Sequence, residues 1–477
     1  MKKNILLTLS TLIAFHFLGT ITAKAQYTTL LDFTGITNGS NPHGDLIYDG
    51  NFLYGMTFAG GQNNFGIIFK IKPDGTGYSK LLEFDNSTNG ASPYGSLVYD
   101  GTFLYGTTLR TIFKIKPDGT GYSTLLDYMS NPNGSLISTG HLISDGTFLY
   151  GMTPSGGTNI CDQYGQGCGI IYKIKTDGTG FSKLHDFSST TGARPWGSLF
   201  YDGTYLYGMT SEGGSLPCQD PHGCGVIFKI KPDGTGYTNL HNFDGITSGG
   251  PTGSLISDGT FLYGLAGSIF KIKPDGTGYS QLSNFAGANG SIFYDGTFIY
   301  GMTREGGTST NCGGGCGTIF KVKTDGTEYS KLLDFTGING SDPMGSLISD
   351  GTSLYGMTRT GGTNNMGVIF SFNLSKPTNI SQISNNTTEI NIFPNPTNSE
   401  ITLSIASVGP KEEFTIKVTD PLSKTVYFEI VKNISGSFTK QIDLSTLPKG
   451  IYFVVIESAN SNISKTATKQ VKKIVLQ

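Results

Sequence analysis

The sequence has no excess of charge of either sign. Its 33 lysine and arginine residues nearly balance its 35 aspartate and glutamate residues, and the formal net charge is −2 over 477 residues. Neither a basic patch nor a polybasic tail is present. Because binding to nucleic acid depends on basic residues that displace counterions from phosphates, the composition argues against a nucleic-acid partner.

Long hydrophobic runs are scarce. The main one covers residues 5–18, after a pair of lysines and before the tripeptide Ala23-Lys24-Ala25. It is shorter than the roughly 20 residues that a spanning helix requires, and a small-residue cleavage pattern follows it. The pattern predicts a secretory signal peptide over residues 1–25. No later run is apolar enough to span a membrane, so we expect no transmembrane anchor.

Cysteine is rare, and its six residues form three close pairs in three loops. The pairs are Cys161 with Cys168, Cys218 with Cys224, and Cys312 with Cys316. A zinc site is the alternative, but no CxxC pair occurs and only one of these loops contains a histidine, His222. Because an exported protein reaches an oxidising compartment, we expect three disulfides. The chain-entropy model assigns such short loops roughly 2 to 2.5 kcal/mol each.

Catalytic and cofactor motifs are also missing. The sequence contains no GxSxG, no HExxH and no phosphate-binding loop. The recurring DGTGY segment offers one carboxylate, whereas a calcium loop needs several oxygen ligands. The sequence therefore predicts no cofactor and no metal, and it favours a protein that is not an enzyme.

What the sequence does contain is a repeat. The cleanest copy, residues 295–335, reads DGTFIYGMTREGG, a variable loop and GTIFKVKTDGTEYSKLLDF. Seven copies follow one another at a spacing of about 50 residues, a period typical of β-propeller blades. Their LYG-type triplets are centred on Tyr54, Tyr105, Tyr150, Tyr207, Tyr263, Tyr300 and Tyr355.

Each copy predicts four short strands, of the GSLV, FLYGMT, GIIFKIK and YSKLLDF types. Asp-Gly pairs separate the first strand from the second and the third from the fourth. Tight hairpins need positive φ, which glycine supplies and aspartate tolerates. We therefore interpret the thirteen aspartates of these pairs as structural.

The two ends of the repeat region complement each other. Repeat seven stops at residues 370–373 without a fourth strand, whereas residues 27–33 form a fourth strand without the rest of a repeat. Pairing them would protect both sheet edges. The sequence thus predicts an all-β, seven-bladed propeller over residues 26–374, closed by the N-terminal strand; an open solenoid, with residues 27–33 as a cap, is the alternative.

A different sequence follows the repeats. Residues 375–389 are polar and predict a linker, and residues 390–477 hold several strands without a helical period. This pattern predicts a small Ig-like β-sandwich.

Residues 27–373 resemble the Gloeo-Verruco (GloVer) tandem repeat. The likeness rests on the recurring words LYGMT, GG, G-IIFKI and DGTGYSKLLDF. This repeat occurs in exported bacterial proteins with varied C-terminal anchors, so the resemblance implies export. The family has no general activity, and the resemblance assigns no reaction to this chain.

The C-terminal segment resembles the type A sorting domain of the type IX secretion system. The matching residues include Pro394, Asn395 and Pro396 at its start, Gly450 and Tyr452 near its end, and Lys473 at the terminus. One place departs: residues 421–423, PLS, stand where the family has a glycine turn. The resemblance implies handling by type IX secretion machinery and export across a Gram-negative outer membrane. It also implies removal of the domain, with release or attachment to surface lipopolysaccharide.

One rim of the predicted propeller carries the loops that vary. Before the glycine of the first strand, different copies place His43, Tyr94, Trp196, Thr252 and Met344. Aromatic side chains at a channel mouth can stack on a sugar; the alternative is loop packing, with Trp196 plugging its own blade. The charged candidates on this rim are Arg110, Glu212, Arg304, Glu305 and Arg359.

These observations favour a monomeric, secreted or surface-displayed module that binds a glycan or a protein. An extracellular carbohydrate-active enzyme, using rim carboxylates such as Glu212 and Glu305, is one alternative, although no motif sets their distance. A structural protein of the envelope is the other. His185 and His241, in the fourth strands, are expected at the surface.

Overall fold

The computed structural model describes most of the chain after residue 25. The described residues are 26–128, 141–161, 167–215, 223–245, 250–251, 253–283, 290–374, 389–393, 397, 399–420, 425–459 and 469–476. All the elements in these ranges are β-strands, and no helix that could cross a membrane occurs among them. The chain divides into two compact units, Met1–Pro377 and Thr378–Gln477.

Four strands recur in each repeat of the first unit. The first strands are β2 (Ile47–Tyr48), β6 (Val98–Tyr99), β10 (Ile143–Ser144), β14 (Phe200–Tyr201), β18 (Ile256–Ser257), β22 (Phe293–Tyr294) and β26 (Ile348–Ser349). The second strands are β3 (Leu53–Thr57), β7 (Leu104–Thr107), β11 (Phe148–Thr153), β15 (Leu206–Met209), β19 (Leu262–Leu265), β23 (Phe298–Thr303) and β27 (Ser353–Thr358).

The third strands are largely buried, with the side chain of the recurring lysine or serine partly exposed, and the fourth strands lie beside them. The third strands are β4 (Ile67–Ile71), β8 (Thr111–Ile115), β12 (Ile170–Lys175), β16 (Val226–Ile230), β20 (Ile269–Ile272), β24 (Thr318–Lys323) and β28 (Val368–Asn373). The fourth strands are β5 (Ser79–Glu83), β9 (Ser123–Asp127), β13 (Ser182–Asp186), β17 (Thr238–Asn242), β21 (Ser280–Ser283), β25 (Ser330–Asp334) and, from the start of the chain, β1 (Tyr27–Asp32).

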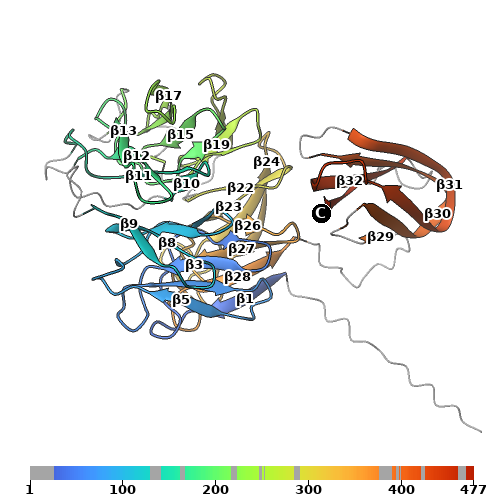
Figure 1. Ribbon diagram of the computed structural model, residues 1–477, viewed down its shortest axis with the longest axis horizontal. Coiled ribbons are helices and arrows are strands. Elements are labelled where there is room, and N and C mark those ends of the chain that lie inside the picture. Colours follow the sequence, from blue (N-terminus) through green and yellow to red (C-terminus); the bar gives the residue numbers. More distant parts are fainter. Residues whose placement is uncertain are drawn as a thin grey trace, which may run out of the picture. The chain divides into compact units, whose positions relative to one another are not determined.

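The strands form four-stranded antiparallel sheets, as in propeller blades. In repeat one the order is β2-β3-β4-β5, and repeats two to six follow the same order. The sheet of repeat seven is β26-β27-β28-β1, so its fourth strand comes from the N-terminus. Tyr27 pairs with Phe372 and Asp32 with Val368, and β1 lies beside β28 in Figure 1.

The Asp-Gly turns between first and second strands are built alike in every repeat. In repeat one, Asp49 accepts hydrogen bonds from the backbone N–H groups of Asn51 and Phe52, both at 2.7 Å. Its other oxygen accepts a bond from the Tyr54 hydroxyl at 2.8 Å, and the seven equivalent Tyr–Asp bonds are 2.7 to 2.9 Å long. Gly50 has φ +100°. These contacts account for the aspartates without a ligand.

Hydrophobic clusters join each sheet to the next one along the chain. One cluster combines Met56 and Ile68 of repeat one with Leu104 and Phe113 of repeat two. Another combines Tyr355 and Met357 of repeat seven with Leu53 and Ile67 of repeat one. Residues of the last repeat and of the first therefore share one hydrophobic cluster.

Lysines of the third strands add a polar link between neighbouring repeats. Lys70 Nζ lies 5.0 Å from the centre of the Phe52 ring and donates a hydrogen bond of 3.1 Å to the carbonyl of Pro117, in the next repeat. Lys173 and Lys229 make the same bond to Pro232 and Pro274 at 2.9 and 3.1 Å. The lysine can thus bury its aliphatic stem while its ammonium group interacts with an aromatic ring and a backbone carbonyl.

His185 and His241 lie against aromatic rings of the following repeat rather than free at the surface. The His185 ring stacks on Tyr237 at 3.8 Å with an interplanar angle of 2°, and His241 stacks on Tyr279 at 3.7 Å. His185 Nε2 is buried without a hydrogen-bond partner among the described residues. Burial lowers the pKa of His185 to about 4 and also lowers that of His241.

Because the pKa values of these two histidines are lowered in the folded protein, we expect the protein to lose stability in mild acid. The pKa of His185 is lower in the folded state than the roughly 6.5 of an unfolded chain, so the unfolded state binds the proton more tightly. Its contribution to the free energy of unfolding therefore falls as pH drops from about 6.5 towards 4. We expect His185→Phe, which keeps the stacked ring, to reduce this loss by about 1–2 kcal/mol.

Urea unfolding at pH 7 and pH 5 measures this effect. Lys183→Gln, two residues earlier in the same strand, is the control, because it leaves the stacked ring unchanged. A pH dependence as steep in His185→Phe as in the parent protein would contradict the prediction.

The second unit contains β29 (Glu389–Phe393), β30 (Glu400–Thr419), β31 (Thr425–Asp443), β32 (Gly450–Ala459) and β33 (Lys469–Leu476). They form one five-stranded antiparallel sheet in the order β29-β30-β32-β33, with β31 also paired to β30. The strands β30 and β31 are long, with 20 and 19 residues, and the register of their pairing shifts repeatedly between Ile405 and Phe414. Both halves of β30, with Ile401 in the first and Ile416 in the second, contribute to one hydrophobic core, as the two layers of the expected sandwich would.

Several residues of the expected sorting motif are placed in this unit. Gly450 begins β32, Lys473 pairs with Phe453, and Tyr452 is buried and donates a hydrogen bond of 2.7 Å to the carbonyl of Pro448. Pro394, Asn395, Pro396 and the turn at 421–423 lie outside the described residues.

Candidate functional site

A pocket of about 300 Å³ lies where the loops that lead into the first strands meet. Every repeat contributes to its wall, although these residues are far apart in the sequence. The lining residues, in order of repeat, are His43; Tyr94; His141; Trp196 and Gly197; Ser254; Gly290, Ser291 and Arg304; and Pro343 and Met344. The pocket is therefore a shared feature of the seven repeats, and we call it the central pocket.

Glycines that lie three residues before the first strands allow the repeats to approach one another at this pocket. A Cβ on Gly197 would clash with the carbonyl of Gly253, and one on Gly253 would clash with that of Gly290. A Cβ on Gly345 of repeat seven would lie 2.6 Å from the carbonyl of Gly44 in repeat one. Close backbone packing explains why this position is glycine in each repeat.

The residue after each of these glycines links neighbouring repeats by a hydrogen bond. The N–H of Ser198 donates to Ser254 Oγ at 2.8 Å, and the N–H of Ser254 donates to Ser291 Oγ at 3.2 Å. The same pattern connects Ser346 of repeat seven to the carboxylate of Asp45 in repeat one. Because these bonds involve the backbone, they hold the pocket wall in one geometry.

Two repeats replace this serine by an ionisable residue, and the two side chains meet. Asp45 of repeat one and His141 of repeat three are 3.1 Å apart, between Oδ2 and Nδ1. His141 Nε2 lies 3.4 Å from Ser96 Oγ, in repeat two. Burial raises the pKa of Asp45, but the charge of His141 and the hydrogen bonds from His141, Ser346 and Ser96 outweigh it and hold this pKa below its usual value.

Sequence reasoning missed the pair of Asp45 and His141. A signal was available, because the position after the glycine is serine in five repeats and differs only in these two. What the sequence could not show is that repeats one and three are close enough for their side chains to touch.

The aromatic candidates line the central pocket, and two of them are in contact. The rings of His43 and Tyr94 are 4.4 Å apart, and both pack near Phe58. Burial and, secondarily, the charge of Arg359 lower the pKa of His43 to about 4, so this ring is neutral at pH 7. Trp196 is 36% exposed and lines the pocket, as Met344 does.

Arg304 and Arg359, from repeats six and seven, converge on one carboxylate. Arg304 Nε donates to Asp342 Oδ1 at 2.6 Å, and Arg359 Nε donates to Asp342 Oδ2 at 2.5 Å. Arg304 lines the central pocket and also an adjacent cavity of about 320 Å³, which Glu305 and Cys312 border. Arg359 is close to His43 but is not a lining residue.

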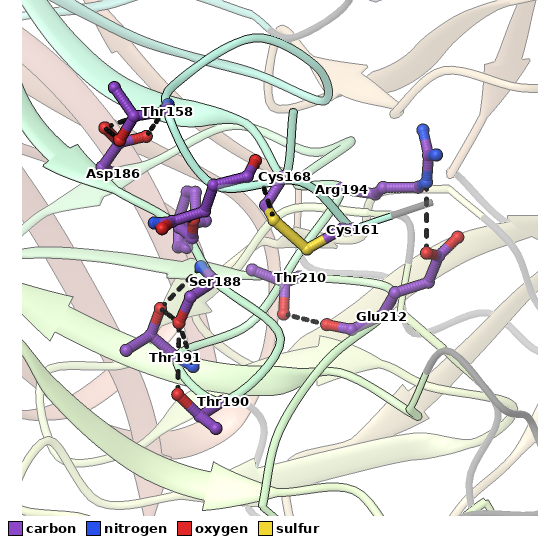
Figure 2. The surroundings of a disulfide bond; sticks show 12 residues. Thr158, Cys161, Cys168, Asp186, Ser188, Thr190, Thr191, Arg194, Thr210 and Glu212 are labelled. Carbon is purple, nitrogen blue, oxygen red and sulfur yellow. Dashed lines mark hydrogen bonds and ion pairs between the residues drawn. A yellow bond between two sulfur atoms is a disulfide. The ribbon is translucent and has the colours of Figure 1, made fainter. Parts of the chain in front are cut away.

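The other charged candidates lie elsewhere. Arg110 makes an ion pair with Asp127 of its own repeat, at 2.6 Å. Glu212 accepts a hydrogen bond of 3.1 Å from Arg194 (Figure 2), and Glu305 borders only the adjacent cavity. The structure thus does not bring Glu212 and Glu305 together in the central pocket, and Thr252 lies outside the described residues.

Disulfides close two of the variable loops. Cys161 is bonded to Cys168 and Cys312 to Cys316. Figure 2 shows the disulfide between Cys161 and Cys168. Cys224 is also disulfide-bonded, and its expected partner Cys218 lies outside the described residues. Where the chain is described, no three His, Cys, Asp or Glu side chains are grouped so that they could hold a metal ion.

Comparisons with protein families give two matches. Residues 17–159, 109–294 and 265–391 match the model of the Gloeobacter/Verrucomicrobia repeat. Residues 391–475 match that of the secretion system C-terminal sorting domain. No curated protein matches the sequence.

Two of the solved structures that resemble this chain are distant from it in sequence. The extracellular domain of a hybrid two-component system of B. thetaiotaomicron is 12% identical with a TM-score of 0.48, over 94% of this chain and 57% of that one. A quinohemoprotein alcohol dehydrogenase of Pseudomonas putida HK5 is 10% identical with a TM-score of 0.43, over 80% of this chain and 72% of that one. At these values we draw nothing about function from either protein.

Proposed function

The chain belongs to the Gloeobacter/Verrucomicrobia repeat family and ends in a secretion system sorting domain, and from this premise we propose that it is an exported β-propeller that binds a glycan in its central pocket. The sorting domain points to secretion or display at the cell surface through type IX machinery. Residues 1–25, which lie outside the described residues, would be the signal peptide that takes the chain across the inner membrane.

We infer a closed ring of seven blades over residues 26–374, joined by the segment 375–389 to the sorting domain. Three contacts between repeats seven and one support closure. They are the pairing of β1 with β28, the hydrophobic cluster that contains Tyr355 and Leu53, and the bond from Ser346 to Asp45. An open solenoid would leave its first and last repeats without such contacts.

One observation carries the binding proposal. The residues of turns and strands repeat from copy to copy, and so do the glycine and, in five copies, the serine that line the central pocket. The residue before this glycine differs in nearly every copy, and the pocket is lined there by His43, Tyr94, Trp196 and Met344. A rigid scaffold with one variable concave face is where ligands bind in such folds. Trp196 offers a partly exposed aromatic face there, which suits the apolar face of a sugar ring.

The carboxylates do not favour the enzyme alternative. Glu212 is engaged by Arg194, and neither it nor Glu305 lines the central pocket. A glycosidase would need two carboxyl groups on either side of one scissile bond.

Binding to a glycan array tests the proposal. We expect Trp196→Ala to weaken any glycan binding by at least about tenfold, because a tryptophan that stacks on a ligand often contributes a large share of the binding free energy. Tyr329→Ala is the matched control, since Tyr329 is 46% exposed and does not line the pocket. An array without any bound glycan, or equal binding by Trp196→Ala and the parent protein, would contradict the proposal.

A further inference from the structure

Where the chain is described, no aspartate or glutamate lines the central pocket. The two carboxylates beside the pocket are already engaged: Asp45 by His141 and the N–H of Ser346, and Asp342 by Arg304 and Arg359. Such a wall presents few charged acceptors to a ligand. It therefore favours a ligand that brings its own acceptors.

Arg304 supplies a charged donor to this wall. Its Nε is held by Asp342, but no hydrogen bond to its two Nη groups is found among the described residues. The side chain is 41% exposed, against 15% for Asp342. A guanidinium whose position is set by one carboxylate can present its outer edge to a second anion in a bidentate arrangement.

The charges around Arg304 leave a positive excess at this point. Arg304 and Arg359 share the single carboxylate of Asp342, so this cluster carries one uncompensated positive charge. Glu305, the residue after Arg304, borders the adjacent cavity and not the central pocket. His43 is neutral at pH 7 and does not change this balance.

We propose that the central pocket recognises an acidic sugar, with the carboxylate or sulfate of the sugar on the outer edge of Arg304 and its ring against Trp196. This inference rests on the proposed function and adds the chemical class of the ligand. Arg304 sets the preference for an anion, and Trp196 supplies binding energy that neutral and acidic sugars share.

Calorimetry on the mature full-length protein separates the two roles. The probes are an oligogalacturonate, a sulfated galactan oligosaccharide and the neutral galactan oligosaccharide of the same length. We expect one of the acidic probes to bind at least about tenfold more tightly than the neutral one, and whichever probe that is identifies the anion. Arg304→Gln should weaken this binding between about ten- and 150-fold, the range for hydrogen bonds to charged groups, and leave neutral binding unchanged.

Two further variants test whether the effect is specific to the position and to the guanidinium group of Arg304. Arg110→Gln removes a rim arginine of similar exposure, 43%, that is also ion-paired, and it should change no affinity. Arg304→Lys keeps the charge without the planar fork and should fall between Gln and the parent. Asp342 retains Arg359 in both Arg304 variants, so we expect their thermal unfolding to match that of the parent.

Other results of these binding experiments would overturn either the acidic-sugar assignment alone or the proposed glycan binding as a whole. Equal affinity for acidic and neutral probes, or acidic binding that survives Arg304→Gln, would overturn the assignment of an acidic sugar and leave the binding pocket standing. Absence of binding to all three probes and to the glycan array would overturn both.

Discussion

Protein that begins at Thr34, without β1, is expected to lose more than about 5 kcal/mol of its free energy of unfolding. Phe33 is fully buried against Phe69, with ring centres 5.7 Å apart, and truncation of one such phenylalanine costs about 3–5 kcal/mol. Tyr27 adds a stacked contact with Phe370 and a hydrogen bond of 2.6 Å to the carbonyl of Asn339. The backbone pairing of β1 with β28 is lost as well.

The same deletion should also promote association between molecules. Without β1, the edge of β28 exposes unpaired backbone groups that another chain can pair with. Urea unfolding and size-exclusion chromatography measure the two effects. A synthetic peptide of residues 26–34 should restore part of the stability, because it can add itself as the missing strand.

A second variant shows whether the deletion acts through the expected contacts. Phe33→Ala in the protein that begins at Gln26 should account for about 3–5 kcal/mol of the loss and leave the protein monodisperse. If the protein that begins at Thr34 unfolded at the same urea concentration as the parent, the ring would not depend on β1 and closure by the N-terminal strand would be wrong.

Asp45→Ala is expected to reduce the free energy of unfolding by about 2–4 kcal/mol. Asp45 is only 18% exposed, and its carboxylate joins repeats one, three and seven through His141 and the N–H of Ser346. Its removal leaves both donors without their acceptor, and unsatisfied buried groups are costly. The central pocket should lose shape, so glycan binding should weaken as well.

Ser346→Ala is the matched control at the same position of repeat seven. Ser346 Oγ donates only to the carbonyl of Leu347, at 3.1 Å, and its truncation should cost less than about 1 kcal/mol. A loss in Asp45→Ala as small as in Ser346→Ala would show that the bonds of Asp45 do not stabilise the ring.

The pH dependence gives an independent check on Asp45. Its pKa is lower in the folded protein than in an unfolded chain, so its contribution is fully present above the unfolded value of about 3.9. This contribution is lost as the pH falls through the folded value. Asp45→Asn should therefore be less sensitive to acid below about pH 4 than the parent, as measured by urea unfolding at pH 5 and pH 3.

Local features of this protein could be read from the sequence because they are set within a few residues. The Asp-Gly turns depend on the positive φ of one glycine and on an aspartate that accepts bonds from residues two, three and five positions away. The pairs Cys161–Cys168 and Cys312–Cys316 close loops within one repeat. The partner of β1 could be predicted as well, because the first and last repeats lack complementary strands.

The tertiary structure alone decided which residues of different repeats meet. Asp45 and His141 are 96 positions apart, yet their side chains are in contact, whereas Glu212 and Glu305 remain apart from the central pocket. Arg304 and Arg359 share Asp342 because the loops of repeats six and seven are adjacent. Such contacts depend on how tightly the sheets curve around the pocket. That curvature comes from packing between whole sheets, and no short stretch of sequence encodes it.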